Sequence, residues 1–90
     1  MKITKEQTED LRSQYVAFAE NCTDTSKFPT LYRIHRMLDL TIDNFDTYLE
    51  KELDSMQRVV VGAMTKPWKK DRVVPATNEE VENYYNTMKA

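Results

Sequence analysis

One thiol and one imidazole are the side chains with the greatest capacity for covalent chemistry. The 90-residue chain contains a single cysteine, Cys22, and a single histidine, His35. A thiolate activated by an imidazole is the nucleophile of thiol hydrolases, but those enzymes also need an orienting group and backbone donors for an oxyanion. No orienting residue or glycine-rich loop is recognisable here. We therefore interpret Cys22 as a packing residue and His35 as a contact residue, and expect no enzyme activity.

The single cysteine and the single histidine also limit which metal sites and disulfides the chain can form. One cysteine and one histidine cannot form an intrachain disulfide or a tetrahedral zinc site. Four acidic side chains recur at helical spacing, namely Asp39, Asp43, Asp46 and Glu50. Such a row could hold a divalent cation or face a basic partner, although like charges at this spacing usually form a solvated surface. We favour the solvated surface and expect no metal and no cofactor.

Positive and aromatic side chains gather in two segments and together suit a nucleotide. The denser segment is 66–72, where cations surround Trp68 and only Asp71 opposes them; a more scattered set lies within 15–36. Cations bind phosphates, and aromatic faces stack on bases. The alternative for both segments is a solvated surface whose aromatic residues cover the core. The predicted ligand-binding residues are Tyr15, Lys27, Arg33, Trp68, Lys69, Lys70 and Arg72.

Helix start and stop signals place these residues on an all-α chain. Thr4 is followed three residues later by Gln7, and Thr77 by Glu80, and both pairs have the spacing of a capping box. We expect a short N-terminal helix over about 5–21 and a short C-terminal helix over about 78–89. Between them, Pro29 suits a first helical turn and Pro67 ends a helix. Gly62, the only glycine, could permit close approach of another helix or a ligand, or could equally be tolerated there without a role, at a cost of about 1 kcal/mol relative to alanine.

The middle of the chain carries an eleven-residue apolar repeat. Its nine positions are Ile34, Leu38, Ile42, Phe45, Leu49, Leu53, Met56, Val60 and Met64. An eleven-residue period keeps one stripe on one side of a nearly straight helix, so the pattern predicts one long central helix over about 29–66, continuous through Thr41. At 1.5 Å per residue this helix would be roughly 57 Å long, against about 30 Å for a compact chain of this size. We therefore expect a helical homo-oligomer with the interface Leu38, Ile42, Phe45, Leu49, Leu53, Met56 and Val60.

The length and the net charge of the chain limit the kinds of partner that it can bind. Ninety residues suit one helical domain over 1–90, which buries too little surface to be more than marginally stable alone. A formal net charge of -2 argues against binding duplex nucleic acid. The chain contains no signal-peptide pattern and no apolar stretch long enough for a membrane span, so we expect a cytoplasmic protein.

Residues 45–67 combine three features with a counterpart in a known family. They are Leu53, the apolar run 59–61 and the closing segment Ala63-Met64-Thr65-Lys66-Pro67. Over this quarter of the chain the sequence resembles the phage sponges that bind cyclic oligonucleotides and disarm the CBASS anti-phage signalling system. The family's glycine- and glutamine-rich turn is replaced here by residues 54–57.

The resemblance implies a homo-oligomer, expected to be a hexamer, which holds cyclic di- or trinucleotides between protomers in the host cytoplasm without catalysis. The leading hypothesis is therefore a non-enzymatic binding protein that sequesters a cyclic oligonucleotide signal and blocks host antiviral signalling. The alternative is a small helical protein–protein inhibitor or adaptor that uses its long helix and acidic flank to cover a basic surface.

Overall fold

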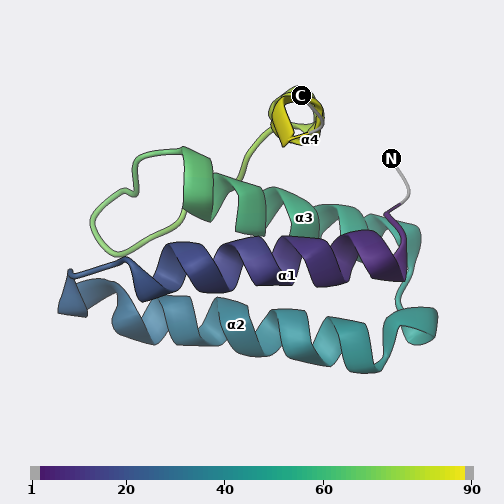
Figure 1. The fold of residues 1–90 in the computed structure, drawn as a ribbon, viewed down its shortest axis with the longest axis horizontal. Helices are drawn as coiled ribbons and strands as arrows, with labels where there is room; N and C mark the ends of the chain where they lie inside the picture. Colours follow the sequence, from purple (N-terminus) through teal and green to yellow (C-terminus); the bar gives the residue numbers. More distant parts are fainter. Residues whose placement is uncertain (1–2, 89–90) are drawn as a thin grey trace.

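Four α-helices and two short 3-10 turns make up the computed structural model, which describes residues 3–88 (Figure 1). In chain order the elements are α1 (Lys5–Glu20), η1 (Thr25–Lys27), α2 (Phe28–Asp43), η2 (Phe45–Thr47), α3 (Glu50–Thr65) and α4 (Asn78–Met88). The predicted all-α class is confirmed, and α1 begins at the expected residue and ends one residue early. The helix α4 begins at the predicted Asn78, while the predicted end at Lys89 lies outside the described residues.

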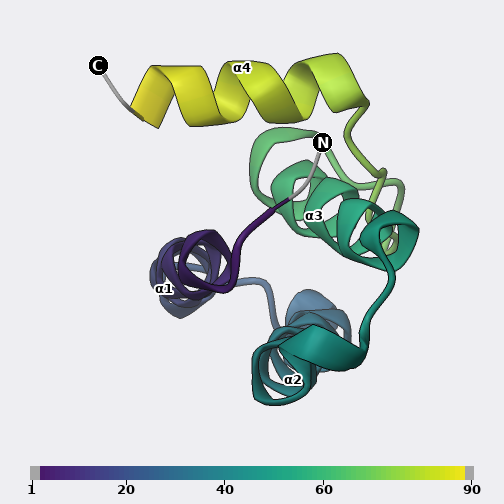
Figure 2. The same cartoon turned by 90° about the vertical axis from the view of Figure 1, so that its right-hand side faces the viewer.

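The first three helices lie side by side, and the fourth crosses them. Seen almost end-on in Figure 2, α1, α2 and α3 occupy the corners of a triangle, while α4 runs across the side of the bundle next to α3. The described chain has a radius of gyration of 12.5 Å and extents of 33 × 28 × 20 Å. No helix among residues 3–88 has both the length and the apolar character needed to cross a membrane.

The predicted long central helix over 29–66 is wrong, because the chain turns back after Asp43. Asn44 and Tyr48 leave the helical conformation, and the 3-10 turn η2 lies between them. Side chains donate hydrogen bonds to backbone oxygens at this turn: Asn44 Nδ2 donates to Leu40 O at 3.1 Å, and Thr47 Oγ1 donates to Asn44 O at 2.7 Å. Short polar side chains that bond to nearby backbone compete with helix formation in this way. The turn therefore replaces one projecting helix with two shorter helices.

Folding back also buries the apolar stripe within one chain. Leu38, Leu53, Met56 and Val60 are at most 5% exposed, and together with Ile34 they form part of the core between the helices. Most of the predicted oligomer interface thus lies in the interior of one chain. The prediction that these four residues contact another copy is wrong. Of the other three, Phe45 and Ile42 are half-buried and Leu49 is 59% exposed. A single chain therefore covers most of the stripe that had required an oligomer.

Both predicted capping boxes are present. Thr4 Oγ1 accepts from Gln7 N at 3.0 Å, and Thr4 N donates to Gln7 Oε1 at 2.9 Å. At α4, Thr77 N donates to Glu80 Oε1 at 2.8 Å, and Glu80 N donates to Thr77 Oγ1 at 3.1 Å. Each pair satisfies two backbone donors that the first helical turn leaves without partners.

The segment 66–77 leaves α3, forms a loop and returns along the same helix. Its return crosses Gly62 so closely that a β-carbon there would lie 2.1 Å from Val74 O. Ala76 N donates to the backbone oxygen of Arg58 at 2.9 Å, and Arg58 Nε donates back to Ala76 O at 3.0 Å. Gly62 therefore permits the close approach of this chain's own loop, and this approach fixes where the basic residues of the loop lie.

Candidate functional site

Tyr15, a predicted base-stacking residue, lies in the core. Its side chain is 0% exposed, and its hydroxyl donates to Leu31 O at 2.9 Å, which ties α1 to α2. Burial raises the pKa of this phenol, and the nearby Cys22 adds to the effect. A buried ring cannot stack on a ligand base, so the assignment of Tyr15 to the ligand site is wrong.

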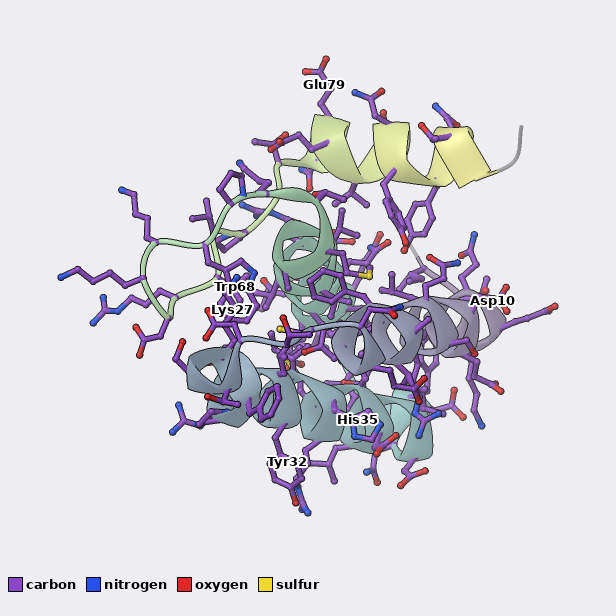
Figure 3. All side chains as sticks on the ribbon, turned by 60° about the vertical axis from the view of Figure 1, so that its left-hand side comes forward. Asp10, Lys27, Tyr32, His35, Trp68 and Glu79 are labelled. Atoms are coloured by element: carbon purple, nitrogen blue, oxygen red, sulfur yellow. The ribbon has the colours of Figure 1, made fainter. Side chains whose placement is uncertain are left out.

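Trp68 and Lys27, predicted from two separate segments, contact each other. Lys27 Nζ lies 4.9 Å from the centroid of the Trp68 ring, within the range of a cation–π interaction. Trp68 Nε1 donates to Ala63 O at 3.0 Å, so the indole is anchored to the end of α3. Figure 3 shows the two side chains together where the loop meets the start of α2. One face of the indole is therefore already covered by an ammonium group.

A tight hairpin presents the remaining loop cations. Lys69 and Arg72 exchange two backbone hydrogen bonds of 2.9 Å, and Lys70 at the tip has a φ of 57°. This left-handed conformation is unfavourable for a residue with a side chain, at about 1 kcal/mol. Lys69, Lys70 and Arg72 are all exposed, and in Figure 3 nitrogen-tipped side chains of this loop point away from the helices.

The hairpin lies against the first turns of α2. Thr30 Oγ1 donates to Asp71 O at 3.2 Å, which links the hairpin tip to a residue one turn before Arg33. Six of the seven predicted ligand-binding residues thus gather at one end of the molecule. We call this set the basic end: Lys27, Arg33, Trp68, Lys69, Lys70 and Arg72.

Within residues 3–88, the cations of the basic end form no ion pair with a carboxylate, although Lys27 interacts electrostatically with Asp24. The ion pairs within residues 3–88 lie elsewhere, joining Arg12 and His35 to Asp39 and Lys66 to Glu80. The acidic neighbours in sequence are Asp24 and Asp71. Hydrogen bonds from Ser26, with a smaller contribution from Lys27, lower the pKa of Asp24. The basic end therefore keeps an excess of positive charge although the whole chain carries -2.

Two exposed aromatic residues at the same end were not among the predicted ligand-binding residues, although Tyr32 belongs to the scattered set within 15–36. Phe28 is 46% exposed and Tyr32 is 61% exposed, both in the first turns of α2. The signal that could have found them is their spacing, because Leu31, Ile34 and Leu38 define the buried side of the helix and leave Phe28 and Tyr32 off it. These rings, rather than that of Tyr15, are accessible to a ligand.

Two adjoining hollows lie along the outside of α2 and α3. The first, of about 330 Å³, is lined by Tyr32, Arg33, Arg36, Met37, Leu40 and Tyr48. The second, of about 460 Å³, shares Met37 and Tyr48 with it and continues along α3 past Lys51 and Val59. Together they form an open, largely apolar groove with arginines at one end. No residue pattern in the sequence indicated this groove.

The acidic row and the two candidate nucleophilic residues are separated by the fold. Asp39 pairs with Arg12 and with His35, whose Nδ1 lies 3.8 Å from Asp39 Oδ2, so these residues connect α1 with α2. Cys22 instead contacts the backbone oxygen of Asp24 at 3.9 Å. Because α2 ends at Asp43, the row from Asp39 to Glu50 is not one helical flank, and the predicted adaptor surface along a long helix is wrong. Within residues 3–88, no three His, Cys, Asp or Glu side chains are grouped for a metal ion.

Comparison of the chain with models of protein families, with curated proteins and with solved structures finds no match.

Proposed function

We propose that this chain is a non-enzymatic binding protein that sequesters a phosphate-bearing nucleotide at its basic end. The observation that carries the proposal is that five cations, which form no ion pair with a carboxylate within residues 3–88, lie at the end of the molecule where Lys27 covers an anchored indole. They come from two segments about forty residues apart, which the Thr30–Asp71 hydrogen bond and the Lys27–Trp68 contact bring together. Local excess charge of this kind favours an anionic ligand.

The chemistry of the two halves of a nucleotide matches the two kinds of side chain. Phosphate oxygens would accept charge-assisted hydrogen bonds from Lys69, Lys70 and Arg72 on the hairpin. A base would stack on the exposed ring of Phe28 or Tyr32, because every base has a flat face and stacking contributes about 1–3 kcal/mol. The covered indole of Trp68 would form the floor of the site. A cyclic di- or trinucleotide, with several phosphates and bases, is the ligand class that uses most of these groups at once.

The test is a thermal-shift titration with cyclic dinucleotides and cyclic trinucleotides. A ligand that binds only the folded chain raises the melting temperature as its concentration exceeds the dissociation constant. Converting Lys69 and Lys70 together to Glu should weaken binding by well over tenfold, because each charge-assisted bond contributes about 1.5–3 kcal/mol and reversal adds repulsion.

The matched control reverses two exposed lysines away from the basic end, Lys5 on α1 and Lys51 on α3. This pair changes the net charge by the same amount, so it should retain the affinity within a few-fold. Loss of binding in both double variants would assign the effect to net charge alone. Absence of binding by every cyclic nucleotide would reject the proposed ligand class.

A further inference from the structure

The outer face of α2 exposes apolar side chains that no other helix within residues 3–88 covers. Leu40 is 48% exposed and Tyr32 is 61% exposed, and both line the hollow beside α2. Tyr32 points away from the helices in Figure 3. On the opposite side of α2, Leu31, Ile34 and Leu38 are buried against α1 and α3. An apolar groove therefore runs along the helix, and the exposed Leu40 lines its first hollow.

Charges are ordered along this face. Arg33 and Arg36 lie on the N-terminal side of Leu40, and Asp43, the last residue of α2, lies on its C-terminal side; all three side chains are exposed. Arg36 precedes Leu40 by four residues and Asp43 follows it by three, which corresponds to about 6 and 4.5 Å along the helix axis. The two opposite charges are thus almost equally far from Leu40.

We propose that this face binds the same face of a second copy, with the two α2 helices antiparallel and the two-fold axis beside Leu40. Such an arrangement places Leu40 against Leu40 of the second copy and Arg36 opposite Asp43 of the second copy, twice by symmetry. Antiparallel pairing also aligns the helix dipoles favourably. Basic and acidic groups lie at matching distances on the two sides of Leu40, so the face is complementary to itself. A partner of unrelated sequence would not need this arrangement, which therefore identifies the occupant as a second copy.

This interface is distinct from the one predicted from the eleven-residue repeat, whose central residues are interior. Tyr32 and Arg33, at the N-terminal end of this face, also belong to the proposed nucleotide site, but Arg36, Leu40 and Asp43 do not. Because the inference depends on these three residues, it does not rest on nucleotide binding. Failure of one proposal therefore leaves the other intact.

The test measures mass by sedimentation equilibrium over a range of concentrations. The parent should approach twice the chain mass of 10.6 kDa as concentration rises. Leu40→Glu should weaken the dimer by more than tenfold, and so should Arg36→Asp or Asp43→Arg alone, because each places like charges opposite one another. Circular dichroism checks that each variant keeps its helices.

Mixing provides the sharper experiment. In a mixture of Arg36→Asp with Asp43→Arg, a dimer of one variant with the other again places opposite charges at both contacts between positions 36 and 43. The mixture should therefore form a heterodimer although each variant alone stays monomeric, and the chain with both changes should dimerise with itself. Asp10→Arg, the same charge change at an exposed α1 position, is the control and should dimerise like the parent. A parent that stays monomeric at millimolar concentration overturns the inference, and so does an oligomer that persists in the single variants or a mixture that fails to associate.

Discussion

Gly62 lies where the returning loop crosses α3, and the spacing leaves no room for a side chain. A β-carbon at this position would lie 2.1 Å from Val74 O, 2.8 Å from Ala76 N and 2.9 Å from Pro75 Cα. All three are backbone atoms, so no rotation of a side chain can relieve the contact. The single glycine of the chain therefore sets the distance between the loop and α3, and through it the position of the basic end.

Gly62→Ala should destabilise the fold by about 1–3 kcal/mol. Overpacking against backbone typically has this magnitude and exceeds the gain of about 1 kcal/mol that alanine brings to a helix interior. Ser55→Ala, on the exposed side of the same helix, isolates the propensity effect and should be neutral or slightly stabilising. Urea denaturation of both variants measures the difference. Equal or higher stability of Gly62→Ala would show that the loop does not approach α3 as described.

Residue types identified most of the candidate site, but they could not distinguish buried side chains from exposed ones. Tyr15 and Tyr32 are both tyrosines near cations in the sequence, yet one is 0% exposed and the other 61%. The difference depends on where α1 and α2 meet, since the Tyr15 hydroxyl needs the backbone oxygen of Leu31 as its acceptor. Only the packing of two helices decides which aromatic ring a ligand can reach.

At the scale of elements, local signals located the helix ends except at one turn. Thr4, Pro29, Pro67 and Thr77 mark boundaries through their own side chains, and the structure places helix ends within a residue or two of each. The turn after Asp43 has no proline or glycine, and an apolar stripe with an eleven-residue period continues through it. The same stripe is buried by two helices folded together, so periodicity alone cannot separate the two arrangements.

Glu50→Pro distinguishes these arrangements. Glu50 is the first residue of α3, and Leu49 before it is extended, with φ -76° and ψ 153°, as a residue preceding proline should be. We expect Glu50→Pro to change the free energy of unfolding by less than about 1 kcal/mol. Proline inside one continuous helix would instead lower that free energy by about 3 kcal/mol or more. Thr41→Pro is the positive control, because Thr41 lies within α2 and should be strongly destabilised in either arrangement. Chemical denaturation of both variants gives the comparison.

The helix α4 is attached by polar contacts that reach into the bundle. Gln57 is 2% exposed, and its Oε1 accepts from the Tyr85 hydroxyl at 2.7 Å. The hydroxyl of Tyr84 donates to Gln14 of α1, and Lys66 Nζ lies 3.1 Å from Glu80 Oε1. Burial of the apolar Val81 accompanies these bonds. The position of α4 thus depends on matching polar groups from three helices.

Tyr85→Phe should destabilise the fold by about 1–3 kcal/mol, because it leaves the buried oxygen of Gln57 without its donor. Tyr32→Phe removes the same hydroxyl from an exposed ring and should change stability by less than about 0.5 kcal/mol. Denaturation gives the free energies, and hydrogen exchange should show faster opening of α4 in Tyr85→Phe alone. Similar behaviour of the two variants would contradict the buried contact.

At the scale of the whole molecule, the arrangement of charges emerges only after folding. Lys27 and Lys69 are 42 positions apart in the sequence, yet their segments meet because α1, α2 and α3 alternate in direction and the loop follows the end of α3. Composition could establish that cations and aromatic rings are present in suitable numbers. Their convergence required the turn after Asp43, which no residue pattern indicated, and the close crossing at Gly62, where the sequence indicated a close approach but not that the chain's own loop makes it.

Three tyrosines couple the stability of the whole molecule to alkaline pH. Burial raises the pKa of Tyr15, Tyr84 and Tyr85, and for Tyr15 and Tyr85 a neighbouring ionisable group adds to the effect. The unfolded chain releases these protons near pH 10, whereas the folded chain holds them more tightly. Their contribution to stability is therefore complete below about pH 10 and is lost as the pH rises through the folded values.

We expect the free energy of unfolding to fall above pH 10, with a slope of up to about 1.4 kcal/mol per pH unit for each proton that the folded chain retains. Tyr15→Phe removes one of these protons. It should be less stable than the parent at pH 7, by about 1 kcal/mol for the lost bond to Leu31, but its stability should decline less steeply above pH 10. Urea denaturation at several pH values gives both slopes, and tyrosinate absorbance shows whether ionisation accompanies the loss of helix. A slope identical to that of the parent would mean that solvent reaches the Tyr15 hydroxyl in the folded chain, in conflict with its place between α1 and α2.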